Sequence, residues 1–246
     1  MTTKWPQDTA VLVPAYHARQ FLSSLLPRIM DHVPAGQIVV VDDASGDGTC
    51  ALCEMAGITC LRHETNRGKG AALATGFDYL LQKNFSFIIT MDADGQHDPA
   101  DLGAFVAAKS ASSTPGLCIG CRNMKFGVMP PARILSNRLT SFILGLLCGR
   151  RILDSQCGYR LYAARLLKKI RIGFDRFEME SEVIMKAAFL GFPIMFTPVQ
   201  TLYLKGPSNI SHVADTLRWT GAVLRIRMQR NAVIRYARMH DVGTQV

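Results

Sequence analysis

Residues 88–99 read Ile88-Ile89-Thr90-Met91-Asp92-Ala93-Asp94-Gly95-Gln96-His97-Asp98-Pro99, an apolar run that ends in closely spaced carboxylates. The run predicts a buried strand over 86–91, and Asp98-Pro99 predicts the start of a helix. Two carboxylates that leave a buried strand two residues apart are costly to place together unless a cation shares them. We therefore expect a metal site formed by Asp92 and Asp94, with a turn rich in Asp as the alternative interpretation.

Short apolar runs alternate with helical patterns on both sides of this strand. The expected strands lie at 10–14, 37–41, 58–62, 86–91 and 116–120, and the expected helices at 20–32, after Gly48, at 69–81 and after Pro99. Strands separated by helices indicate βαβ units, and therefore an α/β fold with a mostly parallel central sheet. Ligands of such sheets bind beyond the carboxyl ends of the strands, where Tyr16, Asp42 and Asp43 also lie.

The second half of the chain is basic. Residues 122–246 carry 20 Lys/Arg against 7 Asp/Glu, whereas residues 1–121 carry 8 against 12. Helices are expected at 133–148, 180–190 and 212–239, and a strand at 193–197. The 133–148 helix mixes bases with apolar residues, which is typical of an interfacial helix in lipid headgroups, although a core helix or dimer surface would also fit.

No run approaches the ~20 apolar residues that cross a bilayer. We therefore expect peripheral contact with an anionic membrane surface. Seven cysteines, an odd number, and no apolar leader after Met1 indicate a reducing, cytoplasmic location without disulfides.

The spacings Cys50-x-x-Cys53 and Cys118-x-x-Cys121 raise the possibility of a four-thiolate zinc site. A strand would place residues 118 and 121 on opposite faces, which does not suit a shared ion. Free cysteines are often buried, so we interpret these as core residues.

Six motifs occur in a fixed order between about residues 9 and 218. They are Val13-Pro14-Ala15-Tyr16, Val41–Thr49, Asn66-Arg67-Gly68-Lys69-Gly70, Asp92–Pro99, Asp154–Arg160 and Glu180-x-Glu182. With these motifs the chain resembles family 2 glycosyltransferases, and within them the polyprenyl-phosphate glycosyltransferases such as dolichyl-phosphate mannose synthase. The resemblance implies a single GT-A (Rossmann-like) domain over residues 1–246, with helices flanking the sheet. A nucleotide-sugar-binding half would cover about 9–121, and an acceptor-side half with amphipathic helices about 122–240.

The resemblance also implies a nucleotide-sugar donor, a polyprenyl-phosphate acceptor and Mg²⁺ or Mn²⁺. The residues it assigns to the donor are Pro14, Ala15, Tyr16, Asp42, Asp43, Lys69, Asp92, Ala93 and Arg122, and those it assigns to the metal are Asp92, Asp94 and Gln96. Three of these interpretations have structural alternatives. Tyr16 could be a core residue, Asp43 could cap the following helix, and Lys69 could be a solvated side chain rather than part of a phosphate cradle.

Three residues are expected to act in catalysis: Asp94, Arg133 and Asp154. Arg133, like Arg122, is suited to bind a phosphate group. The alternative interpretation is that each is a solvated surface arginine. Asp154 is the first candidate for a general base, with Glu180 and Glu182 as structural alternatives. A phosphate acceptor is already ionised near pH 7, so the base could be dispensable.

The expected activity is inverting sugar transfer to a lipid-linked acceptor, and the alternative is transfer to a soluble or glycan hydroxyl. A sugar-1-phosphate nucleotidylyltransferase would need a Gly-rich loop with an arginine after the first strand, where Pro14-Ala15-Tyr16 stands instead. A nucleic-acid binder, suggested by a pI near 9.4, would leave Asp92 and Asp94 without a role and shows no recognition motif. We therefore expect no nucleic-acid partner. The Lys205–His212 segment resembles an acceptor-side loop, with a lysine where some relatives have arginine.

Overall fold

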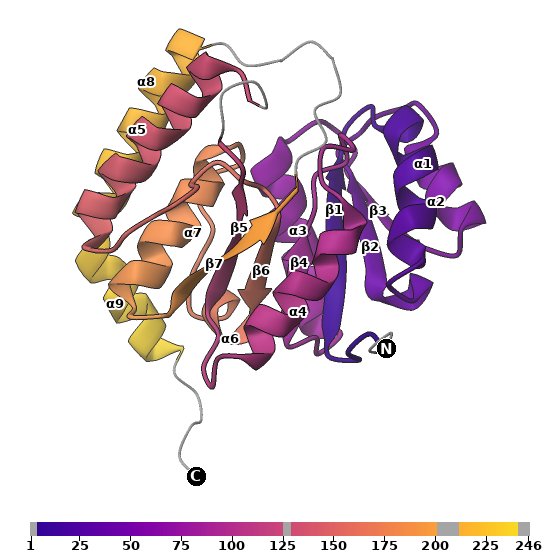
Figure 1. Cartoon of the computed structure of the whole chain (residues 1–246), viewed down its shortest axis with the longest axis horizontal. Coiled ribbons are helices and arrows are strands. Elements are labelled where there is room, and N and C mark those ends of the chain that lie inside the picture. Colours follow the sequence, from indigo (N-terminus) through magenta and orange to yellow (C-terminus); the bar gives the residue numbers. More distant parts are fainter. Residues whose placement is uncertain (1–3, 125–128, 201–211, 241–246) are drawn as a thin grey trace.

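The computed structural model describes residues 4–124, 129–200 and 212–240 of the 246-residue chain. The centre of the molecule is a seven-stranded sheet in the order β3-β2-β1-β4-β6-β5-β7 (Figure 1). Its strands are β1 (Thr9–Ala15), β2 (Ile38–Asp42), β3 (Thr59–Arg62), β4 (Phe87–Thr90), β5 (Leu117–Arg122), β6 (Arg160–Ala163) and β7 (Ile194–Val199).

The helices follow the predicted alternation with the strands. They are α1 (Arg19–Met30), α2 (Thr49–Met55), α3 (Lys69–Gln82), α4 (Leu102–Ser110), α5 (Pro131–Cys148), α6 (Ala164–Leu167), α7 (Glu178–Phe189), α8 (His212–Met228) and α9 (Arg230–Met239), with 3₁₀ turns at Ala35–Gln37 and Pro99–Asp101. Each predicted strand and helix is present within a few residues of its expected bounds. The predicted 212–239 helix is divided into α8 and α9 at Gln229.

Strand β6 was not predicted, and it changes the sheet. It lies between β4 and β5 and runs antiparallel to both, pairing Thr90 with Arg160 and Ile119 with Arg160 on its two sides. β6 has only four residues and begins with a buried arginine, so its sequence is too short and too polar to be recognised as a strand from hydrophobic periodicity. Since the remaining pairs are parallel, the prediction of a mostly parallel sheet is confirmed.

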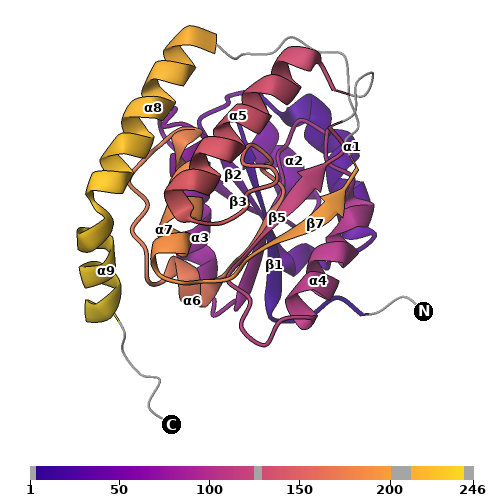
Figure 2. The same cartoon turned by 60° about the vertical axis from the view of Figure 1, so that its left-hand side comes forward.

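Helices cover both faces of the sheet. α3 packs on β1 and β2 and contacts α7, whereas α4 packs on β5 and β7 from the other face (Figures 1 and 2). All seven residues of β1 are buried, as expected for a central strand of a parallel sheet. Gly76 allows α3 to approach closely, because a Cβ at this position would collide with the Leu12 side chain.

A further layer of helices lies outside α7. α5, α8 and α9 each contact α7, and Figure 2 shows α8 and α9 following one another along one edge of the molecule. This layer comes from the basic half of the chain. None of the described helices has the length and apolarity needed to span a membrane.

The prediction that the chain has no disulfide is wrong, because Cys50 of α2 is bonded to Cys60 of β3. The fold returns the chain from α2 against the edge strand and brings the two Cα atoms to 5.5 Å, a separation that composition does not reveal. Cys53 and Cys118 are buried free thiols, as predicted for core cysteines.

Candidate active site

The carboxyl ends of three neighbouring parallel strands bring the predicted polar residues to one edge of the sheet. Ala15 of β1 is in register with Asp42 of β2, and Leu12 with Thr90 of β4, two residues before Asp92. Pro14 and Ala15 are buried in the sheet, whereas the Tyr16 side chain beyond them is 52% exposed. A core role for Tyr16 is therefore excluded.

The Asp43 carboxylate accepts hydrogen bonds from the loop that precedes α3. Its Oδ1 accepts from the backbone N–H of Arg67 at 2.9 Å and lies 2.6 Å from His63 Nδ1, and its Oδ2 accepts from the N–H of Gly68 at 2.7 Å. Asp43 does not cap α2, whose N-cap residue is Gly48 and whose first residue, Thr49, donates its N–H and hydroxyl to Asp47. Sequence reasoning missed His63, whose role depends on a partner 20 residues away.

Asp42 is also buried and is bonded within its own turn. It accepts from the N–H of Ser45 at 3.0 Å and from the Ser45 hydroxyl, and Arg62 Nε lies 3.8 Å from its other oxygen. The Ser45 hydroxyl in turn accepts from the His17 N–H at 2.8 Å, which ties the end of β1 to the end of β2. These bonds give the edge of the site a fixed backbone.

Lys69 joins the carboxylates after β4 to α7. Its Nζ lies 2.7 Å from Asp92 Oδ1 and 2.7 Å from Glu180 Oε1, and all three groups are largely buried. Burial alone would lower the pKa of Lys69, but Asp92 and Glu180 raise it by more, so the ammonium remains charged. Lys69 is therefore part of a buried ion cluster, and the interpretation as a solvated surface lysine is wrong.

The two carboxylates of the Asp-x-Asp motif differ in their surroundings. Burial would raise the pKa of Asp92, but Lys69 and His97 lower it by more, to well below its usual range. Burial and the charge of Asp92 raise the pKa of Asp94, whose Oδ1 accepts only the Gln96 N–H among the hydrogen bonds of the described residues. Among the described residues, Asp94 is thus the carboxylate of this motif that has no ion pair.

The loop around the motif is tightly packed. Ala93 between the two carboxylates is buried, and Gln96 is half-buried. Gly158 lies so close that a Cβ there would be 2.8 Å from both Asp92 Oδ1 and Lys69 Nζ. His97 is buried, its Nε2 is 3.7 Å from Asp92, and its Nδ1 has no hydrogen-bond partner among the described residues.

The start of α3 does not form a phosphate cradle. The N–H groups of Gly70 and Ala71 donate to the Asp175 carbonyl at 2.8 and 3.2 Å, so they are not available to an anion. A Cβ at Gly68 or Gly70 would collide with the backbone of residues 174–176. These bonds disfavour a backbone phosphate cradle at Gly70 and Ala71, and the Lys69 ammonium is the charged group of this segment.

Asp154 is fully buried in a second ion cluster. Its carboxylate forms a two-pronged pair with Arg122, in which Nε and Nη2 donate at 2.9 Å each, and it also accepts from Asn137 at 2.8 Å. Burial would raise the pKa of Asp154, but the bonds and charge of Arg122 lower it by more. Asp154 is therefore turned toward Arg122 instead of solvent.

Arg160 and the two glutamates of α7 have structural partners. The fully buried Arg160 guanidinium donates to the carbonyls of Ser155, Cys157 and Glu180, and it lies 3.4 Å from the Glu180 carboxylate. Glu182 accepts from the N–H groups of Gly173 and Phe174 and pairs with Lys186. The bonds from Arg160 to Glu180 were missed because this partner is 20 residues away.

Arg133 lies in the first turn of α5 and is partly exposed, and its guanidinium has no hydrogen bond or ion pair within the described part of the chain. Asn137, one turn later, bonds Asp154. The predicted acceptor-side loop at Lys205 lies outside the described residues. Within 4–124, 129–200 and 212–240, no three His, Cys, Asp or Glu side chains converge as a metal centre.

A mostly parallel sheet with carboxylates beyond β4, and with buried cations beside them, is typical of an α/β protein that binds a ligand at this edge, and its fold is of the GT-A class. Residues 10–171 match the profile of Glycosyl transferase family 2, and the chain belongs to this family. It is therefore a glycosyltransferase that depends on a nucleotide sugar.

Two relatives are similar over most of their length. Polyprenol monophosphomannose synthase of Mycolicibacterium smegmatis is 30% identical over 210 residues, which cover 80% of this chain and 78% of the relative. Undecaprenyl-phosphate mannosyltransferase of Micrococcus luteus is 30% identical over 199 residues, which cover 76% and 81%. The fold is similar to that of glucosyl-3-phosphoglycerate synthase from Mycobacterium tuberculosis, crystallised with Mn²⁺, UDP-glucose and phosphoglyceric acid. The TM-score is 0.69 at 16% identity, over 89% of this chain and 79% of that one.

Proposed function

We propose that this glycosyltransferase moves a sugar, with inversion, from a nucleotide-sugar donor to a polyprenyl-phosphate acceptor at an anionic membrane surface, and that it uses a divalent cation. The observation that carries the proposal is the contrast between Asp94, which has no ion pair among the described residues, and Asp154, which is paired with Arg122. The polyprenyl-phosphate acceptors in the names of both relatives support the choice of acceptor.

The residues after β4 fit a divalent ion. Mg²⁺ is commonly held by one or two carboxylates together with substrate phosphates, so the motif needs no third acidic ligand from the protein. Asp94 would be the principal ligand, with Asp92 and Gln96 beside it, because the charge of Asp94 is the one left uncompensated. When bound, the ion neutralises charge on the departing nucleoside diphosphate.

The remaining donor contacts follow from the edge of the sheet. The exposed Tyr16 ring offers a flat surface to the nucleobase, and Asp42 and Asp43, both buried and bonded within the fold, would fix the loops beside it. Lys69 stays charged and holds Asp92 in place, so its role is to fix the motif and to keep positive charge near the diphosphate.

The bonds and the lowered pKa of Asp154 support a phosphate rather than a hydroxyl as the acceptor group. A carboxylate with a lowered pKa and two arginine bonds is a weak base, and a hydroxyl acceptor would need a stronger one. An ionised phosphate oxygen can attack the anomeric carbon directly as the bond to the nucleoside diphosphate breaks. Asp154 would then act by holding Arg122, and Arg122 and Arg133 would receive the acceptor phosphate.

An apolar stripe on α5 supports the membrane location. Its residues are spaced as one helix face and are 56–70% exposed: Leu135, Leu139, Phe142 and Leu146. Arg138, Arg150 and Arg151 are exposed on or beside the same helix, and α8 adds the exposed Leu217, Leu224 and Met228. Apolar side chains flanked by arginines match an anionic headgroup layer.

The test is a transfer assay with radiolabelled UDP- and GDP-sugars, in which undecaprenyl phosphate and undecaprenol are compared as acceptors, with Mn²⁺ or with EDTA. We expect product from the phosphate alone, only with the cation, and with an anomeric configuration opposite to that of the donor. Transfer to the alcohol at a similar rate would instead establish a hydroxyl acceptor. Full activity in EDTA would reject the cation.

A further inference from the structure

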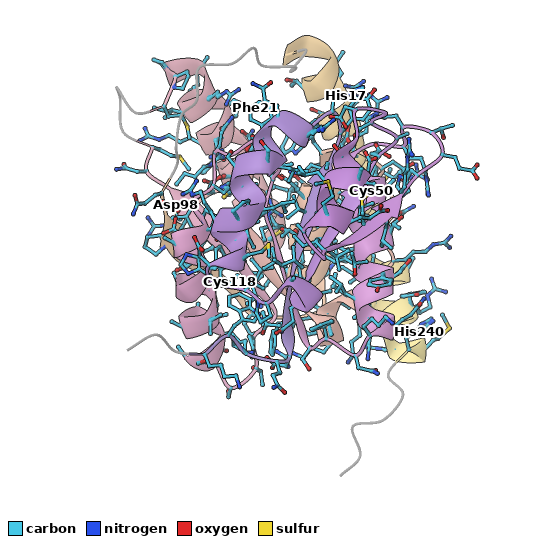
Figure 3. All side chains as sticks on the ribbon, turned by 90° about the vertical axis from the view of Figure 1, so that its right-hand side faces the viewer. His17, Phe21, Cys50, Asp98, Cys118 and His240 are labelled. Atoms are coloured by element: carbon cyan, nitrogen blue, oxygen red, sulfur yellow. A yellow bond between two sulfur atoms is a disulfide. The ribbon has the colours of Figure 1, made fainter. Side chains whose placement is uncertain are left out.

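An open groove among the described residues lies away from the active site. It has a volume of about 560 Å³ and lies between the start of β7, the end of α7 and the outer helix α9. The catalytic edge is formed by the carboxyl ends of the parallel strands, whereas this groove lies at the opposite ends of β5 and β7. Figure 3 shows the separation, with His17 beyond β1 at one end of the molecule and His240 after α9 at the other.

The floor of the groove is apolar and its rim is basic. Phe189, Leu190, Phe192 and Ile234 line it together with Arg165, Lys169 and Arg238, and none of the described residues that line it is acidic. The three bases come from α6, from the segment after it, and from α9. Like charges gathered over an apolar surface repel one another, and a cleft lined by one sign of charge concentrates the opposite ion.

One of the arginines is already held in place. Arg165 Nε and Nη2 both donate to the Pro115 carbonyl, at 2.9 and 2.7 Å, and its guanidinium lies over the Phe192 ring at 5.3 Å. A second arginine, Arg230 of α9, lies over Phe189 at 5.5 Å. Cations fixed before a ligand arrives lose little freedom on binding, so the groove is organised for an anion.

We propose that this groove is a second ligand site, separate from the catalytic centre, that binds a phosphate monoester with an apolar group attached. The phosphate lies among Arg165, Lys169 and Arg238, where Nη1 of Arg165, the Lys169 ammonium and the Arg238 guanidinium are the charged donors. The apolar part lies on Phe189, Phe192 and Ile234. A soluble ester and the headgroup of phosphatidic acid share this chemistry.

The test compares variants of matched charge on the same helix. Arg238→Gln removes a base from the rim, and Arg235→Gln removes an equally exposed base of α9 that does not line the groove. Lys169→Gln and Lys168→Gln form a second pair, since only Lys169 lines the groove. Should Lys169→Gln fail to fold, the α9 pair still decides the question.

The soluble probe is phenyl phosphate, followed by titration calorimetry, and the lipid probe is a phosphatidylcholine vesicle containing phosphatidic acid, followed by co-sedimentation. We expect Arg238→Gln to weaken binding of phenyl phosphate about tenfold, as for loss of one charge-assisted hydrogen bond, and Arg235→Gln to change it less than about twofold. A parallel loss on vesicles identifies the lipid as the source, and a loss confined to phenyl phosphate identifies a soluble ester. Equal binding of both probes by Arg238→Gln and Arg235→Gln overturns the proposal.

Discussion

Asp94 and Asp92 are two residues apart, yet their neighbours give them opposite properties. Asp92 is neutralised by Lys69 at 2.7 Å, and Asp94 is left with a raised pKa because burial and the charge of Asp92 oppose its ionisation. A carboxylate whose ionised form is destabilised by its surroundings when no ligand is bound is typical of a functional residue. This gives the metal proposal a test that separates function from folding.

Asp94→Asn should reduce transfer by at least about a hundredfold, a loss of the size found when a transition-state charge stabiliser is removed. The same change removes like-charge repulsion, so the free energy of unfolding should stay equal or rise. Initial rates at saturating Mn²⁺ and urea unfolding measure the two effects. Asp98→Asn is the control in the same loop, because Asp98 pairs with Arg28 on the surface. A drop in both activity and stability for Asp94→Asn would favour a structural role.

At the scale of elements, the close contact between α3 and β1 sets the position of Lys69 at the start of α3. Gly76→Ala places a methyl group against the buried Leu12, so the free energy of unfolding should fall by about 1–3 kcal/mol, as for an overpacked core. Gly103→Ala in α4 meets nothing within 4 Å and should be neutral or stabilising by about 0.5 kcal/mol. Urea midpoints measure both, and equal effects would show that α3 can shift away from the sheet.

The apolar stripe of α5 is the element that should bring the enzyme to lipid. Replacing Leu139 and Phe142 by Ser removes two side chains that are more than half exposed, so it should weaken vesicle binding severalfold with little loss of fold stability. Met55→Ser, at an 88% exposed residue of α2, is the control. Flotation with anionic liposomes at two salt concentrations gives the comparison. If the stripe variant floats as well as the wild type, α5 is not the docking element.

At the scale of the whole molecule, the buried ion clusters make stability depend on pH. The pKa of Asp154 is lowered below its usual value near 3.8 in the folded state, so its contribution is complete above that value and is lost as the pH falls through the folded pKa. The free energy of unfolding should therefore decline on acidification below about pH 4.

Asp154→Asn should test this dependence directly. At pH 7 it leaves the Arg122 guanidinium without its charge partner in a largely buried site, so the free energy of unfolding should fall by about 3 kcal/mol. Its decline between pH 5 and pH 2 should also be shallower than that of the wild type. Urea unfolding at several pH values measures both, and parallel curves would mean that other groups control acid unfolding.

The alternation of strands and helices and the position of the Asp-x-Asp motif could be predicted from the sequence. Those features depend on local signals, because hydrophobic periodicity and the turn residues at strand ends act within a few residues. The seven buried residues of β1 and the carboxylates directly after β4 are examples. The parallel pairing then places the predicted site residues at one edge.

Features that depend on pairs of distant residues were decided only by the tertiary structure. Lys69 and Glu180 are 111 positions apart, and Arg122 and Asp154 are 32 apart, so no local pattern could show that the cations were already paired. The insertion of β6 between β4 and β5, the Cys50–Cys60 bond and the capping of α3 by the Asp175 carbonyl have the same origin. A residue type determines which bonds a side chain can form, but the path of the chain determines which partner is within reach.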